Sequence, residues 1–290
     1  MAARLRRRGA AGQTRGPVDH GAVMMRWYAI PMLAALAIAA GGVQANDEAT
    51  MKELATTGKL RVGVVAAPSM SAFFVTKDAA GQPRGVTADL GAALAKKLGV
   101  PVEFMVAPNS GEVTDAVSTG AIDVAFMPVD EERKKRIEFG PAYFVVQSTY
   151  LVTAASGIRT LAEVDRQGVR VVGIANTTTI RSAARALKNT TIAAATSVDE
   201  AMAMLRLGTA DAFALSHDSL PPLAATLPGS RILDGGFQQT VIAIAVPKDR
   251  PQALAYVSAF MEDAKASGVV RRALDDAGFK NAAVAPPAPR

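Results

Sequence analysis

Cysteine is absent from the 290 residues, and histidine occurs twice, as His20 and His217. Without cysteine the chain forms no disulfide bond and offers no thiol for a lipid anchor behind a signal segment. The histidines are too few for a typical zinc site, and the sequence has no calcium-binding loop and no phosphate-binding glycine loop. We therefore expect no cofactor and no metal, and a fold that is stabilised by its hydrophobic core.

Positive charge is distributed unevenly along the chain. Residues 1–45 contain six arginines and one aspartate, so this segment carries +5 of the formal net charge of +6. The remainder is nearly neutral and has no basic stripe interleaved with aromatic residues. This pattern disfavours nucleic acid as a partner.

The N-terminal segment has the pattern of a secretory signal. Arg26 precedes an apolar run from Trp27 to Ala40, and small residues follow up to Ala45. The run is shorter than the about 20 apolar residues of a transmembrane helix. Three adjacent arginines lie too far upstream for a twin-arginine signal. We expect residues 1–45 to be a cleaved Sec-type signal peptide with an N-terminal extension, and the protein to be periplasmic and not a lipoprotein.

Two stretches of the chain alternate between strand and helix patterns. The first has strands expected at 60–65, 102–106 and 123–127 and helices at 85–98 and 110–119, with Ser110 as the N-cap. The second has strands expected at 169–174, 191–194 and 211–215 and helices at 178–187 and 198–207. Each alternation predicts a parallel sheet with helical crossovers.

Two long extended stretches, 144–153 and 237–246, connect these halves. We predict an α/β fold with two doubly wound lobes joined by two extended hinge strands, and a ligand-binding cleft between the lobes. The expected parts are the first part of lobe 1 (46–147), lobe 2 (148–238), the return part of lobe 1 (239–278) and a disordered proline-rich tail (279–290).

Arg133 follows the end of the predicted strand 123–127, which Pro128 terminates because proline has no N–H for a sheet. Ligands of open α/β sheets bind outside the carboxyl ends of the strands. A guanidinium group binds a carboxylate through two parallel hydrogen bonds. We therefore expect Arg133 to bind the ligand, and the three basic residues after it to form a solvated face.

Four stretches, in this order, resemble the family 3 extracellular solute-binding proteins, which serve amino-acid-type ABC importers. They are Leu60–Val65 with the loop to Gly81, Gly85–Gly99, Gly120–Tyr143 and Val172–Thr179. The resemblance implies the type II periplasmic-binding-protein fold. It also implies a monomeric protein that captures a small-molecule solute, presents it to a membrane permease and is not an enzyme.

The resemblance implies roles for individual residues. Arg133 matches the arginine that clamps the α-carboxylate of the ligand, Thr178 and Thr179 match donors from the other lobe, and Phe74 matches an aromatic residue that packs on the ligand. Thr177 to Thr179 are equally consistent with plain N-capping, and Phe74 with core packing. The expected ligand-binding residues are Phe74, Met127, Val129, Arg133, Asn176, Thr177, Thr178, Thr179, Ser216 and Asp218.

Two positions depart from the family pattern. Amino-acid binders usually carry an aspartate after the strand 211–215 that pairs with the ligand's ammonium group, where this chain has Ser216, followed by Asp218. Met127-Pro128-Val129 stands where small hydroxyl residues are usual. We therefore expect either an amino acid or a related organic anion that lacks the amine.

Catalytic and interaction functions are the alternatives. Ser216, His217 and Asp218 are neighbours at a helix start, where their side chains splay apart, so they are a poor triad and Ser216 is a simple N-cap. Periplasmic dehydratases of small cyclic carboxylates resemble this two-lobed fold, and Asp218 or His217 would then transfer a proton. A sensor or free interaction partner is the third class, and fold alone does not decide among them.

Overall fold

The first parallel sheet is built around β1 (Leu60–Ala66). This strand pairs with β4 (Val102–Ala107) on one side and β5 (Val124–Pro128) on the other, in the order β4-β1-β5. The crossovers are α2 (Val86–Leu98) and α3 (Ser110–Ser118), and the short β2 (Phe74–Lys77) and β3 (Pro83–Arg84) extend the end of β1. The expected strand–helix alternation is thus confirmed in this half.

The second parallel sheet repeats the arrangement. Its order is β8-β7-β9, formed by β7 (Val171–Ile174), β8 (Ile192–Ala195) and β9 (Ala212–Ser216). The crossovers are α6 (Thr178–Ala186) and α7 (Val198–Arg206). Smaller elements on this half are η1 (Ala154–Ser156), α5 (Leu161–Val164), η2 (His217–Ser219), α8 (Leu220–Ala224) and β10 (Arg231–Ile232).

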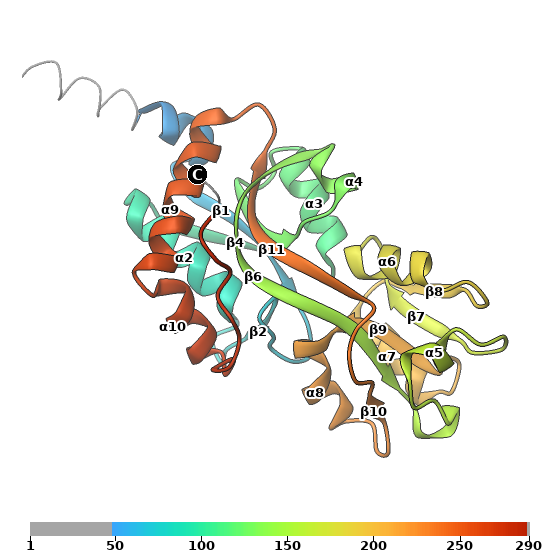
Figure 1. The fold of residues 1–290 in the computed structure, drawn as a ribbon. Coiled ribbons are helices and arrows are strands. Elements are labelled where there is room, and N and C mark those ends of the chain that lie inside the picture. Colours follow the sequence, from blue (N-terminus) through green and yellow to red (C-terminus); the bar gives the residue numbers. More distant parts are fainter. Residues whose placement is uncertain (1–47, 289–290) are drawn as a thin grey trace, which may run out of the picture. The chain divides into compact units, whose positions relative to one another are not determined.

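Two long antiparallel strands run through both halves (Figure 1). They are β6 (Ile137–Val152) and β11 (Gln238–Pro247), and they merge the two sheets in the order β1-β5-β11-β6-β9-β7-β8. After β11 the chain forms α9 (Pro251–Ala266) and α10 (Val269–Asp276), which pack on the first half. This confirms the predicted α/β fold with two doubly wound lobes and two extended connecting strands.

The computed structural model describes residues 48–288, which lie within one unit that spans residues 42–290. The expected signal peptide, residues 1–45, lies outside the described residues. In the described part of the chain no helix has the length and apolarity to cross a membrane. The same residues contain no group of three metal-ligating side chains.

The C-terminal tail differs from expectation. In place of disorder, Val284 forms a β-bridge with Phe144, and the Ala285 N–H donates to the Tyr143 carbonyl at 2.9 Å. The edge of β6 is open at this point because β9 pairs with β6 only from Ser148 onward. Composition alone did not reveal this unpaired edge, which satisfies its backbone groups with the tail.

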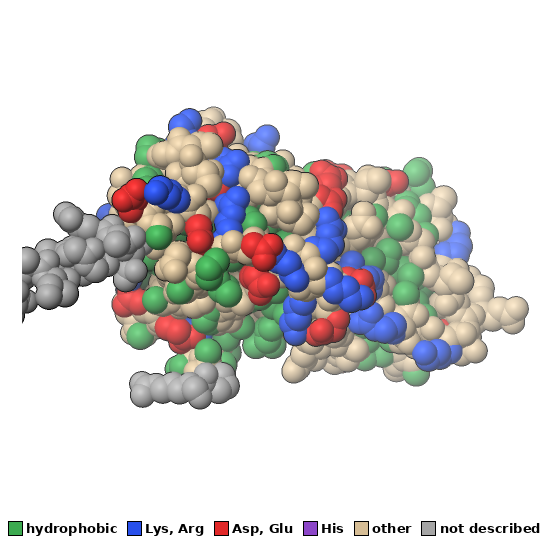
Figure 2. Space-filling view, turned by 90° about the horizontal axis from the view of Figure 1, so that it is seen from above, with side chains coloured by type: hydrophobic (Ala, Val, Ile, Leu, Met, Phe, Trp, Pro, Cys, Tyr) green, Lys and Arg blue, Asp and Glu red, His purple; other side chains and the backbone are tan. Residues whose placement is uncertain are grey.

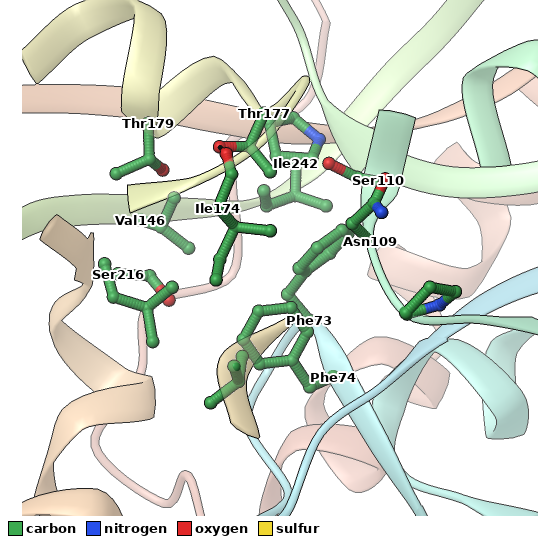
Figure 3. Close-up of a pocket in the computed structure, with 14 residues that line it drawn as sticks. Phe73, Phe74, Asn109, Ser110, Val146, Ile174, Thr177, Thr179, Ser216 and Ile242 are labelled. Atoms are coloured by element: carbon green, nitrogen blue, oxygen red, sulfur yellow. Dashed lines mark hydrogen bonds between the residues drawn. The ribbon is translucent and has the colours of Figure 1, made fainter. Parts of the chain in front are cut away.

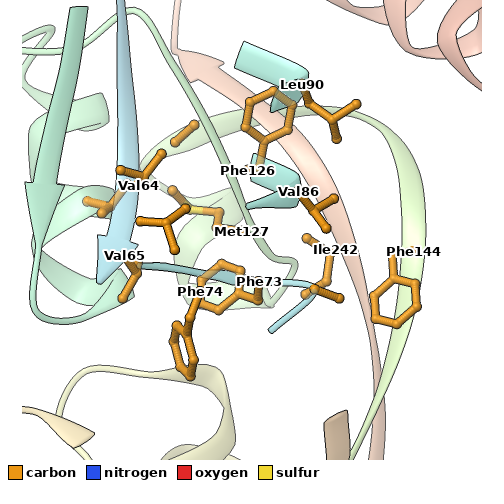
Figure 4. Packing of buried hydrophobic residues seen from close by; sticks show 14 of the residues in the cluster. Val64, Val65, Phe73, Phe74, Val86, Leu90, Phe126, Met127, Phe144 and Ile242 are labelled. Atoms are coloured by element: carbon orange, nitrogen blue, oxygen red, sulfur yellow. The ribbon is translucent and has the colours of Figure 1, made fainter. Parts of the chain in front are cut away.

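The larger hydrophobic core extends from the first half into the second, where it includes residues of β7, β9, α7 and α8. Figure 4 shows Phe73 and Phe74 beside Met127 and Ile242, where the core reaches the ends of β1 and β5 and the middle of β11. The two phenylalanine rings lie 5.1 Å apart and are tilted by 53°. A rigid apolar floor therefore forms at the carboxyl ends of the first sheet.

The surface carries both signs of charge. Figure 2 shows Lys and Arg side chains next to Asp and Glu side chains across the face that it draws. Examples are the ion pairs of Lys134 with Glu131 and of Lys135 with Glu132, whose side chains are all more than half exposed. These lysines form the solvated face that the sequence predicts.

The same bidentate ion pair ties the first and third strands of each sheet. In the first half, Arg61 donates from its backbone N, Nε and Nη2 to Asp123 at 2.6–3.0 Å. In the second half, Arg170 donates from the same three atoms to Asp211 at 2.7–2.9 Å. In the first pair Asp123 is fully buried and Arg61 is 21% exposed, whereas in the second Asp211 is 16% and Arg170 is 53% exposed.

We predict that Asp123→Asn destabilises the protein more than the matched change Asp211→Asn. Arg250 Nη1 also lies 3.5 Å from Asp123 Oδ1, so removing the charge of Asp123 leaves Arg61 and Arg250 without their buried partner. We expect this to cost roughly 3 kcal/mol. The exposed pair of Asp211 should cost about 1 kcal/mol. Urea denaturation of both variants measures the two losses, and equal losses would contradict the role assigned to burial.

Candidate ligand-binding site

A cavity lies where the carboxyl ends of the parallel strands of both halves face each other (Figure 3). The ends of β5, β7 and β9, the start of β2 and the segments that follow β4, β7 and β8 contribute, and the crossing strands β6 and β11 add one residue each. The lining residues are Phe73, Phe74, Pro108, Asn109, Ser110, Pro128, Val146, Ile174, Thr177, Thr179, Val198, Leu215, Ser216 and Ile242. This is the position at which open α/β sheets bind their ligands.

The cavity wall is apolar with a few neutral polar groups. Phe73 and Phe74 lie on one side and the hydroxyl groups of Thr177, Thr179 and Ser216 on another (Figure 3). Among the described residues, no charged side chain lines it. The volume open to the centre of a water molecule is about 30 Å³, which is room for very few waters, so the cleft is nearly closed.

Arg133 lies just behind this wall. It is 3% exposed, and its guanidinium donates to the Pro128 carbonyl at 2.8 Å and to Ser110 Oγ at 2.6 Å. Both acceptors belong to residues that line the cavity. Arg133 makes no ion pair within residues 48–288, and burial lowers the pKa of Arg133 to about 9. A buried cation with neutral partners is costly and attracts an anion.

Ser110 has a different role from the one expected. The N-cap of α3 is Asn109, whose side chain accepts from the Glu112 N–H at 3.0 Å. Ser110 Oγ is therefore free to accept from Arg133. A hydroxyl has one proton and two lone pairs, so Ser110 keeps its proton for a group in the cavity.

Asn176 brings the second half against Arg133. Its carbonyl accepts from the guanidinium at 3.5 Å, the longest of the three contacts of that group. Asn176 has a φ of 58°, a left-handed conformation that asparagine tolerates. A Cβ at Gly111 would lie 2.4 Å from the Asn176 Cβ, so the absence of a side chain at Gly111 permits this approach.

Asp130 forms a second contact between the halves. One carboxylate oxygen accepts from the Arg133 backbone N–H at 2.8 Å and caps α4 (Glu131–Lys134). The other accepts from Thr178 Oγ1 at 2.6 Å and from Arg181. Thr178 is thereby engaged in closing the cleft and does not line the cavity.

Thr177 and Thr179 both line the cavity, but their hydroxyl groups differ in hydrogen bonding. Thr177 Oγ1 accepts from the Ile180 N–H at 3.2 Å and donates to the Ile174 carbonyl at 2.7 Å. It is the N-cap of α6, as the plainer interpretation of the sequence expects. The Thr179 hydroxyl has no hydrogen-bond partner among the described residues, and Thr179 lines the cavity.

Asp218 does not line the cavity. One of its oxygens accepts from the Ala72 N–H at 2.9 Å, across the two halves, and the other is buried without a partner. Burial raises the pKa of Asp218, and the hydrogen bond from the Ala72 N–H, together with the Ser216 side chain, opposes this rise. The nearby Tyr143 hydroxyl is also buried without a partner, and burial followed by the charge of Asp218 raises the pKa of Tyr143.

Ser216 lines the cavity at the end of β9. It is the N-cap residue of η2, as expected, but its side chain forms no capping bond and its hydroxyl is 2.6 Å from Ser219 Oγ. His217 is exposed. Ser216, His217 and Asp218 therefore do not converge on one point.

The structure places four of the ten expected ligand-binding residues on the cavity wall: Phe74, Thr177, Thr179 and Ser216. Arg133, Asn176, Thr178 and Asp218 lie at the seam between the halves. Met127 is in the core, where its sulfur accepts from Thr114, and Val129 pairs with the Val241 carbonyl. Their roles in binding stay predictions.

The remaining wall residues were not expected. Pro108 to Ser110 follow β4 in the way that Arg133 follows β5, so the strand-end rule was sufficient to find them. Val146, Ile174 and Ile242 carry no such signal because an apolar residue in a strand is indistinguishable from core.

Two lobes with a cavity at facing strand ends define a periplasmic-type solute-binding protein. The chain belongs to the bacterial extracellular solute-binding proteins, family 3, whose family model matches residues 60–276. This confirms the resemblance noted in the sequence.

Relatives and solved structures agree with this membership. The glutamine-binding protein of Geobacillus stearothermophilus is 24% identical over 205 residues, which are 69% of this chain and 77% of the relative. The ancestral amino-acid-binding protein AncCDT-1, a precursor of cyclohexadienyl dehydratase, is 28% identical with a TM-score of 0.65, over 78% of this chain and 98% of that one. The L-cysteine receptor of Neisseria gonorrhoeae, 21% identical with a TM-score of 0.69 over 81% and 92%, shares the fold.

We predict that Asp218→Asn gains stability relative to the unchanged protein as pH rises. The folded state favours protonated Asp218, so its contribution to the free energy of unfolding falls as pH increases from 3.8 through the raised pKa. Asparagine does not ionise and keeps an oxygen for the Ala72 N–H. Urea denaturation between about pH 4 and pH 7 measures this trend.

Asp165→Asn is the matched control with the opposite sign. Hydrogen bonds from the backbone of Asn189 and its neighbours lower the pKa of Asp165, so its contribution is present above 3.8 and is lost as pH falls. The control should lose stability at neutral pH and recover in acid. The same trend in both variants would contradict the environment described for Asp218.

Proposed function

We propose that the protein is the periplasmic substrate-binding component of an ABC importer and captures a small carboxylate-bearing solute in the cleft. The observation that supports this most directly is Arg133, a buried guanidinium at the cavity with no carboxylate partner in the described chain. A solute carboxylate supplies the missing negative charge, and such charge-assisted pairs are the strong hydrogen bonds of proteins.

Binding begins with the halves apart. The solute carboxylate approaches Arg133 and Ser110 at the end of the first sheet, and the apolar part of the solute packs on Phe74. Closure then brings Asn176 and Thr179 from the second half. The Asn176 carbonyl, which makes the longest contact to the guanidinium, is the acceptor that the solute replaces first.

Closure is stabilised by contacts that do not touch the solute. Asp130 with Thr178, and Asp218 with the Ala72 N–H, join the two halves. Asn109 adds a bond from its side-chain amide to the Thr196 carbonyl at 3.3 Å. These contacts form in the closed state whichever solute is bound. The affinity for a given solute therefore depends on the hydrogen bonds that Arg133 forms with its carboxylate.

We also propose where the protein is located and what it contacts. The predicted signal segment, residues 1–45, directs export to the periplasm, and the closed monomer delivers its solute to a membrane permease. Family membership supports both steps.

The alternative is a dehydratase, because AncCDT-1 is named as a precursor of one. Proton transfer requires an acid or an imidazole within reach of the substrate. The described cavity wall has neither, and Asp218 is directed at Ala72. We expect no turnover of prephenate or arogenate by the purified protein in a spectrophotometric assay, and measurable turnover would overturn the binding function.

We predict that Arg133→Ala weakens solute binding by roughly 10- to 150-fold, because a hydrogen bond to a charged group contributes about 1.5–3 kcal/mol. A thermal-shift screen of amino acids, polyamines, monocarboxylates and dicarboxylates identifies a solute, and calorimetry then gives its dissociation constant for each variant.

Arg136→Ala is the control, since Arg136 is three residues away, half-exposed and paired with Asp115 at 2.7 Å. It should bind as the unchanged protein does. Thermal unfolding of both variants separates lost binding from lost folding. Equal affinity of Arg133→Ala and the unchanged protein would exclude the anchoring role.

A further inference from the structure

Three helices begin at the cavity. Asn109 is the N-cap of α3, Thr177 that of α6, and Val198 is the first residue of α7. All three residues line the cavity. Helix N-termini carry partial positive charge, so the two halves direct positive potential into the same small space.

Arg133 adds a full positive charge to this field. Its guanidinium touches two cavity-lining residues and meets neutral oxygens only within the described chain. The positive potentials of the helix N-termini and of the arginine add up in the cavity, because no negatively charged side chain lines its described wall.

Four acidic residues lie near the cavity, and none of them lines its wall. Asp218 accepts from the Ala72 N–H with one oxygen and has the other buried without a partner, and Asp130 accepts from Thr178 and Arg181. Glu112 accepts from the Asn109 amide, and Glu200 from Thr196. The position at which an ammonium group would need a carboxylate is occupied by Ser216, whose hydroxyl already pairs with Ser219.

An α-amino acid would therefore bring its ammonium group into a closed, positive cavity without a counter-ion. Taking a charge out of water without a partner is strongly unfavourable. The same cavity suits a hydrocarbon group, because Phe73, Phe74, Ile174, Leu215 and Ile242 make up much of its wall.

We propose that the ligand is an amine-free organic acid with an apolar substituent, and that the cleft discriminates against the corresponding α-amino acid. This rests on the proposed binding function and names its solute class. The carboxylate faces Arg133 and Ser110, and the hydrocarbon group faces the phenylalanines and β9.

Matched pairs that differ in the amine alone test the proposal. The protein, produced from the full-length sequence, is titrated by calorimetry with 4-methylpentanoate against L-leucine, and with 3-phenylpropanoate against L-phenylalanine. The amide 4-methylpentanamide controls for the carboxylate. We expect at least one acid to bind at least about tenfold more tightly than its amino acid, given the cost of an unpaired ammonium, and the amide not to bind.

The outcomes separate this inference from the function on which it rests. Equal or tighter binding of an amino acid, these two or another from the thermal-shift screen, overturns the inference and leaves a solute-binding protein. Failure of all carboxylates and amino acids to bind at millimolar concentration overturns both.

Ser216→Asp supplies an independent test with Ser216→Ala as its control. The aspartate places a carboxylate on the wall, so the variant should bind the organic acid more weakly and the corresponding amino acid more tightly. The ratio of the two dissociation constants should therefore narrow or reverse. The alanine should keep the preference for the acid. An unchanged ratio in Ser216→Asp would contradict the proposed absence of an ammonium partner as the cause of selectivity.

Discussion

The buried guanidinium of Arg133 is the constraint on which the seam between the two halves depends. It is buried without a carboxylate partner in the described chain, and it donates hydrogen bonds to the end of β5, the start of α3 and the loop before α6. Three segments far apart in sequence are thus held around one charge. A buried charge with neutral acceptors lowers the stability of the protein. Groups in such unfavourable environments are concentrated at functional sites.

The fold could be predicted from the sequence because the patterns that indicate its strands and helices are local in the chain. Hydrophobic period and turn residues indicated the strands and helices of both halves, and the rule for strand ends located Arg133. The start of β6 was missed: the chain is extended from Ile137, seven residues before the expected stretch, across the run Phe139-Gly140-Pro141. Gly140 and Pro141 suggest a turn, yet pairing with β11, with bulges between Ile242 and Ala245, overrides that local preference.

The binding site was harder to predict from the sequence, because tertiary packing determines the direction of each side chain. Asp218 and Ala72 are 146 residues apart, and no pattern in the sequence indicates that the carboxylate closes the cleft. Asn109 and Ser110 are both good N-caps, so the exchange of their roles became visible only with Arg133 in place. The apolar wall residues look like core because the wall is the exposed end of the core.

The place of β11 in the sheet has a consequence for the order of folding. This strand lies between β5 and β6, although it comes after the whole second half in sequence. Strands β6 to β9 are complete by Ser216, whereas β5 keeps an unpaired edge until residues up to Pro247 are available. Non-local pairing of this kind slows folding, and an unpaired edge invites wrong partners. The first half of the chain is therefore the last part of the sheet to be completed.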